Sequence, residues 1–572
     1  MTTAARRRNR RHRHFPITAA LLFTLGAAHA QETTGSISGT VTDPSGAQVK
    51  GAVVQLINTD RNATVRTLKT NGSGYYTASS LPLGTYTVKI TDPGFKAEQI
   101  SGVLLHVDDR LTVSRALTVG NEGETINVEA DRVQVNLEDA AAAGLISGNQ
   151  ARELVLSTRN YEQLLSLQPG VDYTGTTDQI YIGPAAPSGF ANTVAFSVNG
   201  QRTSANNWTI DGADNVDRGS NLTLLTFPSV DAIAEFKTER GVYSAEFGRS
   251  AAGQVNVVTR SGTNQFHGGA YEFFRNNVLN ANSWADKNYA SPTQFLTRPP
   301  LRYNDFGYTI GGPVWLPKIY NGHDKTFFFL SQEFRRVITY SSVTDNVPTA
   351  AERAGTFPVA VCTSFVGAGA SCANAGVTQI PTSAFSPTAQ AYLKDVFANV
   401  PLPNANPTQD VHAYNFNARN VYNDTQELVR IDQSFGEKFT GFYRFIHDSI
   451  PTQEPLGYGS GVTAALPGVQ TTNTVSPGTE QLGHITYVHS PKLLLDAGYA
   501  YSYGSIQSRP GGSALLANSP DIKVALPFTN VLGTIPNISF TGYTGLTDAG
   551  IYNDFNRNHN ICLLYTSPSP RD

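Results

Sequence analysis

The stretch LLLDAGYAYSYGS, residues 493–505, alternates between two kinds of side chain. One set is apolar or aromatic and the other is small or polar; in order they are Leu495, Ala497, Tyr499, Tyr501 and Tyr503, against Asp496, Gly498, Ala500, Ser502 and Gly504. A period of two places the two sets on opposite faces of a β-strand. The same alternation occurs in FGYTIGG (306–312) and ELVRIDQSF (427–435), so it predicts a series of strands between residues 266 and 506.

Two features favour lipid as the environment of the apolar face. The predicted strands are about ten residues long, which is the length a tilted strand needs to cross a bilayer. Tyrosine and phenylalanine dominate the apolar face, as they do in the aromatic girdles of membrane barrels. GEKF is a short turn, whereas residues 340–425 form a long, polar, proline-rich loop. The pattern therefore predicts an antiparallel transmembrane β-barrel; a soluble sandwich with its apolar face inward is the alternative.

The number of predicted strands is small for such a barrel. We identify about seven, whereas barrels that enclose a separate domain have about 22 strands. The final residues, CLLYTSPSPRD, do not alternate and do not end in the aromatic residue typical of a last barrel strand. We therefore expect residues 265–560 to be only the first part of a barrel, and residues 562–572 to be a non-native tail similar to translated adapter sequence.

The stretch AAGQVNVVTRSGTNQFHGGAYEFF, residues 251–274, marks the start of the barrel. Its first half is an apolar strand of a soluble domain, SGTN is a turn, and its second half is the first barrel strand. We expect Glu272 to face the lumen between lipid-facing Tyr271 and Phe273. Upstream, residues 137–262 mix a helical pattern in NYEQLLSLQPGV, a short helix at VDAIAEFKT and strands such as VAFSVNGQR, which predicts a small α+β domain.

Residues 35–120 form a third region with short strands and frequent turns. In TYTVKI, Tyr86, Val88 and Ile90 share one face, and Gly, Pro, Asn and Asp separate the strands. This punctuation predicts a small β-sandwich. The order GxVxDxxGxxVxGAxVxL, TNxxGxY and LPxGxYxVxI resembles the carboxypeptidase regulatory-like domain, which has a carbohydrate-binding-like fold. The resemblance implies either carbohydrate binding or a spacer or docking role.

A charged linker, residues 121–136, joins the sandwich to the α+β domain. It contains a β-prone run that has no evident partner strand and consists of Glu124, Thr125, Ile126, Asn127, Val128, Glu129 and Ala130. An extended run of this kind is a docking strand for the sheet edge of a partner. The alternatives are an ordinary linker or the last strand of the sandwich.

The first thirty residues predict export. Several arginines precede the apolar run ITAALLFTLGAA, and Ala28 and Ala30 supply the small-x-small pattern of a signal peptidase site. The apolar run has about a dozen residues, whereas a spanning helix needs about 20. We predict a signal peptide, residues 1–30. In the oxidising compartment that export implies, Cys362 and Cys372 are expected to form a loop disulfide, with two free thiols as the alternative.

Composition and motifs exclude several functions. Lys and Arg number 42 against 45 Asp and Glu, so no basic surplus exists for a nucleic-acid partner. The chain has no GxxxxGK[ST] phosphate loop, no GxSxG elbow, no HExxH motif and no metal-spaced Cys/His cluster. We predict no enzyme, no cofactor and no metal site.

The whole arrangement resembles the TonB-dependent outer-membrane receptors of the Oar-like kind, from about residue 35 to residue 560. The resemblance rests on LLSLQPGV, FSVNGQRTSANNWTIDGADN and FGYTIGGPV. It implies that the α+β domain is a plug inside the barrel and that residues 124–130 are the TonB box. A TonB-type energy-coupling protein of the inner membrane and outer-membrane lipid are the implied partners, with carbohydrate as a further candidate. STRN before Tyr161 departs from the NGRN that such proteins more often have.

The resemblance also implies a location and an activity. The chain would lie in the cell outer membrane, with the sandwich and the TonB box in the periplasm, and force on the box would drive import of a bulky solute. The alternative is an adhesion or secretion-support protein that binds glycan or a partner through its sandwich. For plug retention we predict charged contacts by Arg249, Arg260, Glu272 and Glu333; the alternative is that each is solvated.

Overall fold

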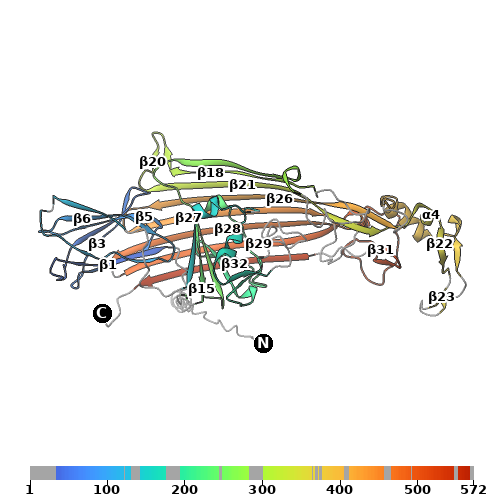
Figure 1. Cartoon of the computed structure of the whole chain (residues 1–572), viewed down its shortest axis with the longest axis horizontal. Coiled ribbons are helices and arrows are strands. Elements are labelled where there is room, and N and C mark those ends of the chain that lie inside the picture. Colours follow the sequence, from blue (N-terminus) through green and yellow to red (C-terminus); the bar gives the residue numbers. More distant parts are fainter. Residues whose placement is uncertain are drawn as a thin grey trace, which may run out of the picture.

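The computed structural model describes residues 34–121, 123–130, 142–156, 158–174, 194–241, 243, 248–281, 300–363, 365–366, 371–372, 376–404, 411–455, 466–490, 493–546 and 552–566. The predicted signal peptide, residues 1–30, lies outside these residues, as do residues 567–572 of the predicted tail. The described part is mainly β, as expected, and consists of a sandwich, a plug domain and one long sheet (Figure 1).

The N-terminal sandwich has two sheets that pack around one core. In the first sheet β1 lies between β4 and β7 and also pairs with β8, and the second has the order β3-β2-β5-β6-β9. Tyr86, Val88 and Ile90 are fully buried between the sheets, which confirms the predicted face. The strands are β1 (Gly35–Thr42), β2 (Val53–Asn58), β3 (Ala63–Lys69), β4 (Tyr75–Leu81), β5 (Gly84–Thr91), β6 (Ala97–Leu105), β7 (Arg110–Thr112), β8 (Arg115–Ala116) and β9 (Thr125–Glu129).

The plug is an α+β domain built on a five-stranded sheet of order β10-β15-β16-β13-β14. Its strands and helices are β10 (Ala143–Ser147), α2 (Gly148–Glu153), η1 (Tyr161–Leu167), β11 (Val171–Tyr173), β12 (Phe196–Val198), η4 (Thr203–Ala205), β13 (Asn207–Ile210), β14 (Ala213–Asp214), η5 (Val230–Ala232), β15 (Ile233–Arg240) and β16 (Gly253–Thr259). The Ser147 side chain caps α2 by accepting a hydrogen bond from Gln150 N. The predicted short helix at VDAIAEFKT is wrong, because only residues 230–232 are helical and the rest is β15.

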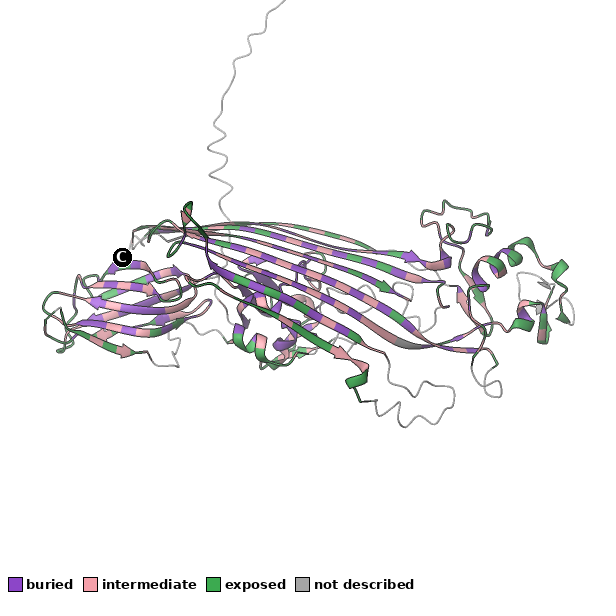
Figure 2. Cartoon of the chain, turned by 90° about the horizontal axis from the view of Figure 1, so that it is seen from above, coloured by how far each residue is buried: buried purple, intermediate pink, exposed green. Residues whose placement is uncertain are grey.

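Eight antiparallel strands form the long sheet, in the order β17-β18-β21-β26-β27-β28-β29-β32. Within the described residues the two end strands are not paired with each other, so the sheet is part of a barrel wall. Its strands are β17 (His267–Asn276), β18 (Arg302–Pro313), β21 (Thr326–Asn346), β26 (Ala413–Ser434), β27 (Phe439–Glu454), β28 (Thr471–Ser490), β29 (Leu493–Gly511) and β32 (Tyr552–Thr566). Figure 2 shows buried and exposed residues alternating along them, as the period of two predicts.

The long strands differ in length from the expectation of about ten residues. β21 has 21 residues and β26 has 22, so at about 3.3 Å per residue each is about 70 Å long. The predicted loop 340–425 is shorter than expected, because β21 continues to Asn346 and β26 begins at Ala413. Backbone pairing does not require apolar side chains. The alternation of apolar residues therefore did not mark the polar ends of these strands. β32 also continues past residue 560 to Thr566, because the backbone of this apolar segment pairs with β29 although its side chains do not alternate.

The two ends of the long sheet are different. At one end, which we call the turn end, β26 and β27 are joined by a four-residue turn that includes Glu437, and the sandwich lies beside it (Figure 1). At the opposite, loop end, three long connections share one small apolar core. They contain α4 (Ala350–Arg353), β22 (Thr356–Val361), β23 (Phe365–Val366), β24 (Ser371–Cys372), β25 (Val377–Gln379), η7 (Thr382–Ala384), α5 (Pro387–Tyr392), η8 (Leu393–Phe397), η9 (Gly512–Ala514), β30 (Ile538–Phe540) and β31 (Tyr543–Leu546). The connection from β17 to β18, which contains η6 (Asn277–Leu279), lies at the same end but contributes none of its described residues to that core. A small hairpin of β19 (Trp315–Leu316) and β20 (Tyr320–Asn321) extends from the turn end.

Candidate functional site

The plug packs against the inner face of the long sheet, and the two share one hydrophobic core. Plug residues such as Phe236 and Val257 belong to the same buried cluster as Phe329, Leu428 and Ile446 of the sheet. Around this shared core, buried charged side chains from the sheet meet charged side chains of the plug. These polar contacts form two networks, which we call the Arg159 network and the Asp211 network.

The Arg159 network joins the plug to the first strands of the sheet. Arg159 is 7% exposed and pairs with Asp231 of the plug, and its guanidinium lies 3.7 Å from Asp305 and 3.9 Å from Glu333 of the sheet. Arg335 adds contacts of 3.1 Å to Asp305 and 3.0 Å to Glu333. Arg159 has φ 53°, a left-handed backbone that is uncommon outside glycine. The plug therefore inserts a cation among carboxylates of the sheet.

The Asp211 network joins the plug to the middle of the sheet. Asp211, at the turn between β13 and β14, lies 3.3 Å from Arg430 Nη1 and 3.4 Å from Arg444 Nε. Arg444 is fully buried and also pairs with Glu480. Asp432 accepts from Arg430 at 3.1 Å and from Arg61 of the sandwich at 3.1 Å. Three arginines and three carboxylates balance in charge, so each buried charge of the network lies beside an opposite charge, which offsets part of the cost of its burial.

Glycines on the inner face of the sheet let the plug approach closely. A Cβ on Gly478 would lie 2.2 Å from the carbonyl oxygen of Leu225 in the plug, and one on Gly504 would lie 2.9 Å from the Leu225 Cα. Real Cβ atoms do not approach other atoms so closely. The small residues on the polar face therefore make room for the plug, a role that alternation alone did not reveal.

The four predicted retention residues have different positions. Glu333 contacts the plug, since Ser229 donates to it at 2.9 Å. Arg260 lies 5.0 Å above the Phe329 ring of the sheet and donates to the Asp231 carbonyl. Arg249 is exposed and pairs at 3.4 Å with Asp214, which also belongs to the plug. The structure therefore places two of the four at the interface, but does not pair them with each other.

The predicted orientation of Glu272 is wrong. Tyr271 donates to Glu333 at 2.7 Å, and the Arg159 guanidinium lies 3.9 Å from the Phe273 ring centre, so both aromatic rings face the plug. Glu272 pairs in register with Phe306, whose ring stacks on Phe334 on the outer face. Alternation separates two faces but does not say which is outside. Here the rings are held inward by the cation and the carboxylate.

Sequence reasoning missed the residues that carry most of the contact. Arg159 stood out only as part of STRN, and no local pattern marked Arg61 or Asp211. Arg430 and Asp432 do alternate with apolar residues in ELVRIDQSF, which was a usable signal for charges on the inner face. Their partners, Asp211 and Arg61, lie in the plug and the sandwich. These residues are too far away in the sequence for a local pattern to indicate the pairing.

The predicted TonB box, residues 124–130, is not an unpaired linker in the structure. Its central residues form β9, which pairs in parallel with β6 as the edge strand of the sandwich sheet. The sandwich therefore extends past the expected boundary at residue 120, because the run completes a sheet that would otherwise end at β6. One edge of β9 is unpaired within the described residues.

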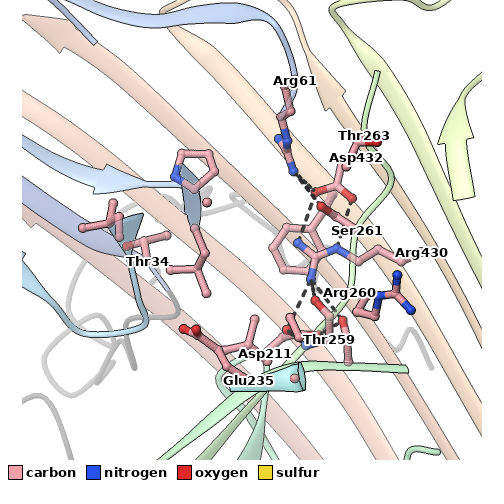
Figure 3. A pocket seen from close by; sticks show the side chains of 18 of the residues that line it. Thr34, Arg61, Asp211, Glu235, Thr259, Arg260, Ser261, Thr263, Arg430 and Asp432 are labelled. Carbon is pink, nitrogen blue, oxygen red and sulfur yellow. Dashed lines mark hydrogen bonds and ion pairs between the residues drawn. The ribbon is translucent and has the colours of Figure 1, made fainter. Parts of the chain in front are cut away.

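The sandwich docks on the turn end of both plug and sheet. A cavity of about 420 Å³ lies where the three parts meet (Figure 3). Thr34 and Arg61 of the sandwich, Arg260 of the plug and Asp432 of the sheet are among its lining residues. Figure 3 shows Arg61 reaching from the sandwich toward Asp432 and Ser261, near the point where the plug continues into the sheet.

Cysteines and other features complete the description. Cys362 is disulfide-bonded, and Cys562 has a reduced thiol. The side chain of Cys372, the predicted partner of Cys362, lies outside the described residues, so the pairing stays a prediction. Within the described part of the chain, no helix is long and apolar enough to cross a membrane. No group of three or more His, Cys, Asp or Glu residues suited to a metal ion occurs among the residues that the structure describes.

Comparison with known families assigns the long sheet. Residues 258–565 match the family model described as outer membrane beta barrel domain. This chain belongs to that family. Residues 36–118 match the carboxypeptidase regulatory-like domain. As a member of the outer membrane beta barrel domain family, the protein lies in the outer membrane, and the apolar face of its long sheet faces lipid.

One curated relative is the TonB-dependent transporter Oar of Myxococcus xanthus, which is 26% identical over 316 residues. The match covers 53% of this chain and spans 27% of the length of that transporter. Similar solved structures include the outer membrane transporter YddB of Escherichia coli, with 9% identity, a TM-score of 0.39 and coverage of 64% of this chain and 39% of that one. A mutant of the ferric enterobactin receptor PfeA of Pseudomonas aeruginosa has 12% identity, a TM-score of 0.32 and coverage of 64% and 50%. These structural similarities are too distant to add to the assignment.

Proposed function

We propose that the chain is part of a TonB-dependent receptor and transporter that imports a bulky solute through a plugged barrel. The observation that carries this proposal is the plug, which is held on the lumenal face by two buried ionic networks. A domain in that position blocks passage until it moves. Ion pairs and hydrogen bonds hold it firmly and still separate without covalent change, so a mechanical input suffices and no enzymatic step or cofactor is needed.

The energy for that movement has to come from elsewhere, because the outer membrane has no ATP. β9 offers an unpaired edge on which a strand of a TonB-type inner-membrane protein would add by main-chain hydrogen bonds. Asn127 and Glu129 are exposed on β9. Under this proposal the turn end, the sandwich and the TonB box are periplasmic. The similarity to the Myxococcus relative, which is named as a TonB-dependent transporter, supports the proposal.

A photo-crosslinking amino acid at Asn127 tests the partner. In cells with an intact inner-membrane proton gradient we expect a crosslink to a TonB-type protein, and none from the same group at exposed Lys50 on the sandwich. Absence of the Asn127 crosslink in folded receptor contradicts the proposed energy coupling and favours the adhesion or secretion-support alternative.

Deletion of residues 124–130 tests the activity. We expect the deletion to abolish energy-dependent uptake while the receptor still reaches the outer membrane, because the plug would receive no force. Unchanged uptake in the deletion variant would contradict the transport proposal.

A further inference from the structure

We propose that the sandwich is a latch across the turn end: its docking holds the plug closed, and tension on β9 releases it. This inference rests on the proposed function, which supplies the tension. It goes beyond that function because it gives the sandwich a mechanical role and makes a domain interface the element that opens.

The first half of the latch is a contact between the sandwich and the plug. Glu235 of β15 accepts from Val107 N at 2.6 Å and contacts His106 Nδ1 at 2.6 Å. Lys237, two residues along the same strand, donates to the carbonyls of Val107 at 3.1 Å and Asp108 at 3.2 Å. Both plug side chains are less than 9% exposed. Two buried charges of the plug are thus satisfied by one sandwich turn, which indicates a specific interface.

The second half is a contact between the sandwich and the rim of the long sheet. Arg61 pairs with Asp432 at 3.1 Å and donates to Ser261 at 3.2 Å. Arg66 donates to the carbonyl of Glu437 at 2.6 Å, in the turn between β26 and β27. The sandwich therefore bridges plug and sheet where the plug chain enters the barrel wall. Sandwich residues, among them Thr34 and Arg61, form part of the wall of the cavity shown in Figure 3.

The strand order connects β9 to the contact between the sandwich and the plug. β9 lies against β6, and β6 ends at Leu105, directly before the turn that contacts the plug. On the other side, β10 follows β9 in the chain and pairs with β15 so that Ser147 is opposite Glu235 and Leu145 is opposite Lys237. Tension along this part of the chain therefore acts on both sides of the Glu235 and Lys237 contact.

The weakest element under such tension is the docking interface. The sandwich has its own core, with Tyr86, Val88 and Ile90 fully buried. The core of the sandwich is separate from the core that the plug and the long sheet share, so hydrogen bonds and ion pairs, and no shared apolar core, hold the sandwich in place. The sandwich is expected to undock as a folded body before it unfolds.

Accessibility of the cavity tests the latch without knowledge of the solute. Val258 lines the cavity and is 5% exposed, so a Val258→Cys variant carrying Cys562→Ser reports opening by reaction with a maleimide reagent added to cells whose outer membrane is permeabilised. We expect slow labelling that accelerates at least fivefold when Arg61→Ala and Glu235→Gln are combined. Lys50→Ala, on an exposed part of the sandwich, is the matched control and should leave labelling unchanged. Heat-modifiable mobility on gels verifies that each variant is folded.

A crosslink provides the opposite perturbation. The backbones of Asp60 and Asn264 are hydrogen-bonded at 3.1 Å, so Asp60→Cys with Asn264→Cys is expected to lock the sandwich in place. The lock should keep Val258→Cys protected under all conditions. Reduction, followed by removal of the reductant before the maleimide is added, should restore labelling of Val258→Cys, which is read by peptide mapping because the thiols of the lock and of the Cys362 disulfide also react.

Three results decide between the two proposals. Faster labelling in the Arg61 and Glu235 variant, together with labelling of the parent that requires the proton gradient and residues 124–130, supports the latch and its release by tension. Unchanged labelling in that variant and in the reduced lock overturns the latch. In the third case labelling is faster in the Arg61 and Glu235 variant, but labelling of the Val258→Cys parent depends neither on the proton gradient nor on residues 124–130. This result supports closure by the sandwich and overturns the proposed energy coupling.

Discussion

At the residue scale, Arg159 is the plug cation on which the first network depends. It pairs with one plug carboxylate and lies within 4 Å of two carboxylates of the sheet. Its neighbours on the sheet, Tyr271 and Phe273, turn their rings toward it. A single side chain therefore contacts carboxylates of both the plug and the sheet, and it accounts for the inward orientation of two aromatic rings of the first barrel strand.

Arg159→Ala is expected to destabilise the plug by about 3–5 kcal/mol, because removal of one partner leaves buried carboxylates uncompensated. Hydrogen exchange of β15 and β16 in the purified receptor measures the effect as faster exchange. Arg249→Ala is the control, since that side chain is 68% exposed and pairs within the plug, and it should change stability by less than about 1 kcal/mol. Equal effects of the two substitutions would contradict the assigned network.

Gly478→Ala is expected to displace the plug, because the new methyl group would lie 2.2 Å from the Leu225 carbonyl of the plug as well as 2.1 Å from the Asp448 carboxylate of the sheet. The cost of such overpacking is about 1–3 kcal/mol, visible as a lower midpoint of thermal unfolding. A Cβ on Gly483, five residues along the same strand, would have no other atom within 4 Å, so Gly483→Ala should be tolerated. A similar loss of stability in both variants would contradict this account, because it would show that the strand, and not the contact with the plug, requires glycine at position 478.

At the element scale, the turn after β6 connects the sandwich to β15 through His106 and Glu235. Burial alone would lower the pKa of His106, but the hydrogen bond and negative charge of Glu235 outweigh it and raise the pKa above the usual 6.5. Asp109 raises it further, and Lys237 opposes them. The protonated imidazole is thus the form that the docked turn favours.

Docking of the sandwich is consequently expected to weaken with rising pH. Because the pKa in the docked state is raised, the contribution of His106 is fully present below pH 6.5 and is lost as the pH rises through the raised value. Distances between spin labels on the sandwich and on the turn between β26 and β27 report the docked fraction. His106→Gln should flatten the pH dependence; a dependence that persists in that variant would assign it to another group.

β9 shows how an element gains its role from its neighbours. Its local sequence favours an ordinary linker or the last strand of the sandwich, and a docking strand is the alternative. Pairing with β6 settles its position in the resting structure and leaves one edge unpaired within the described residues. The TonB-box assignment remains a proposal about that edge.

At the scale of the whole molecule, the two largest hydrophobic cores predict two unfolding units. The sandwich has its own core, whereas the plug and the long sheet share one. In calorimetry we expect Val88→Ala to lower the midpoint temperature of the sandwich transition alone. We expect Phe236→Ala to lower the free energy of unfolding of the unit shared by plug and sheet by about 3–5 kcal/mol. A single transition that responds to both substitutions would indicate that the docking interface couples the domains more strongly than its polar contacts suggest.

Local patterns in the sequence determined much of the fold. The period of two, the short turn at 436–439 and the apolar strand QVNVVT predicted a sandwich, an α+β plug and barrel strands in the correct order, because these features depend on a few adjacent residues. The alternation in TYTVKI likewise predicted which face of that strand is buried.

Only the tertiary structure decided which face of β17 is outside, where β9 pairs, and which charges meet across the lumen. Arg61 and Asp432 are 371 positions apart, and Arg159 and Glu333 are 174 apart, so no local pattern links them. Alternation divides a strand into two faces with equal periodicity, and the choice between them depends on what packs against each. That choice is made by the plug, whose cation draws Tyr271 and Phe273 inward and leaves Glu272 on the outer face.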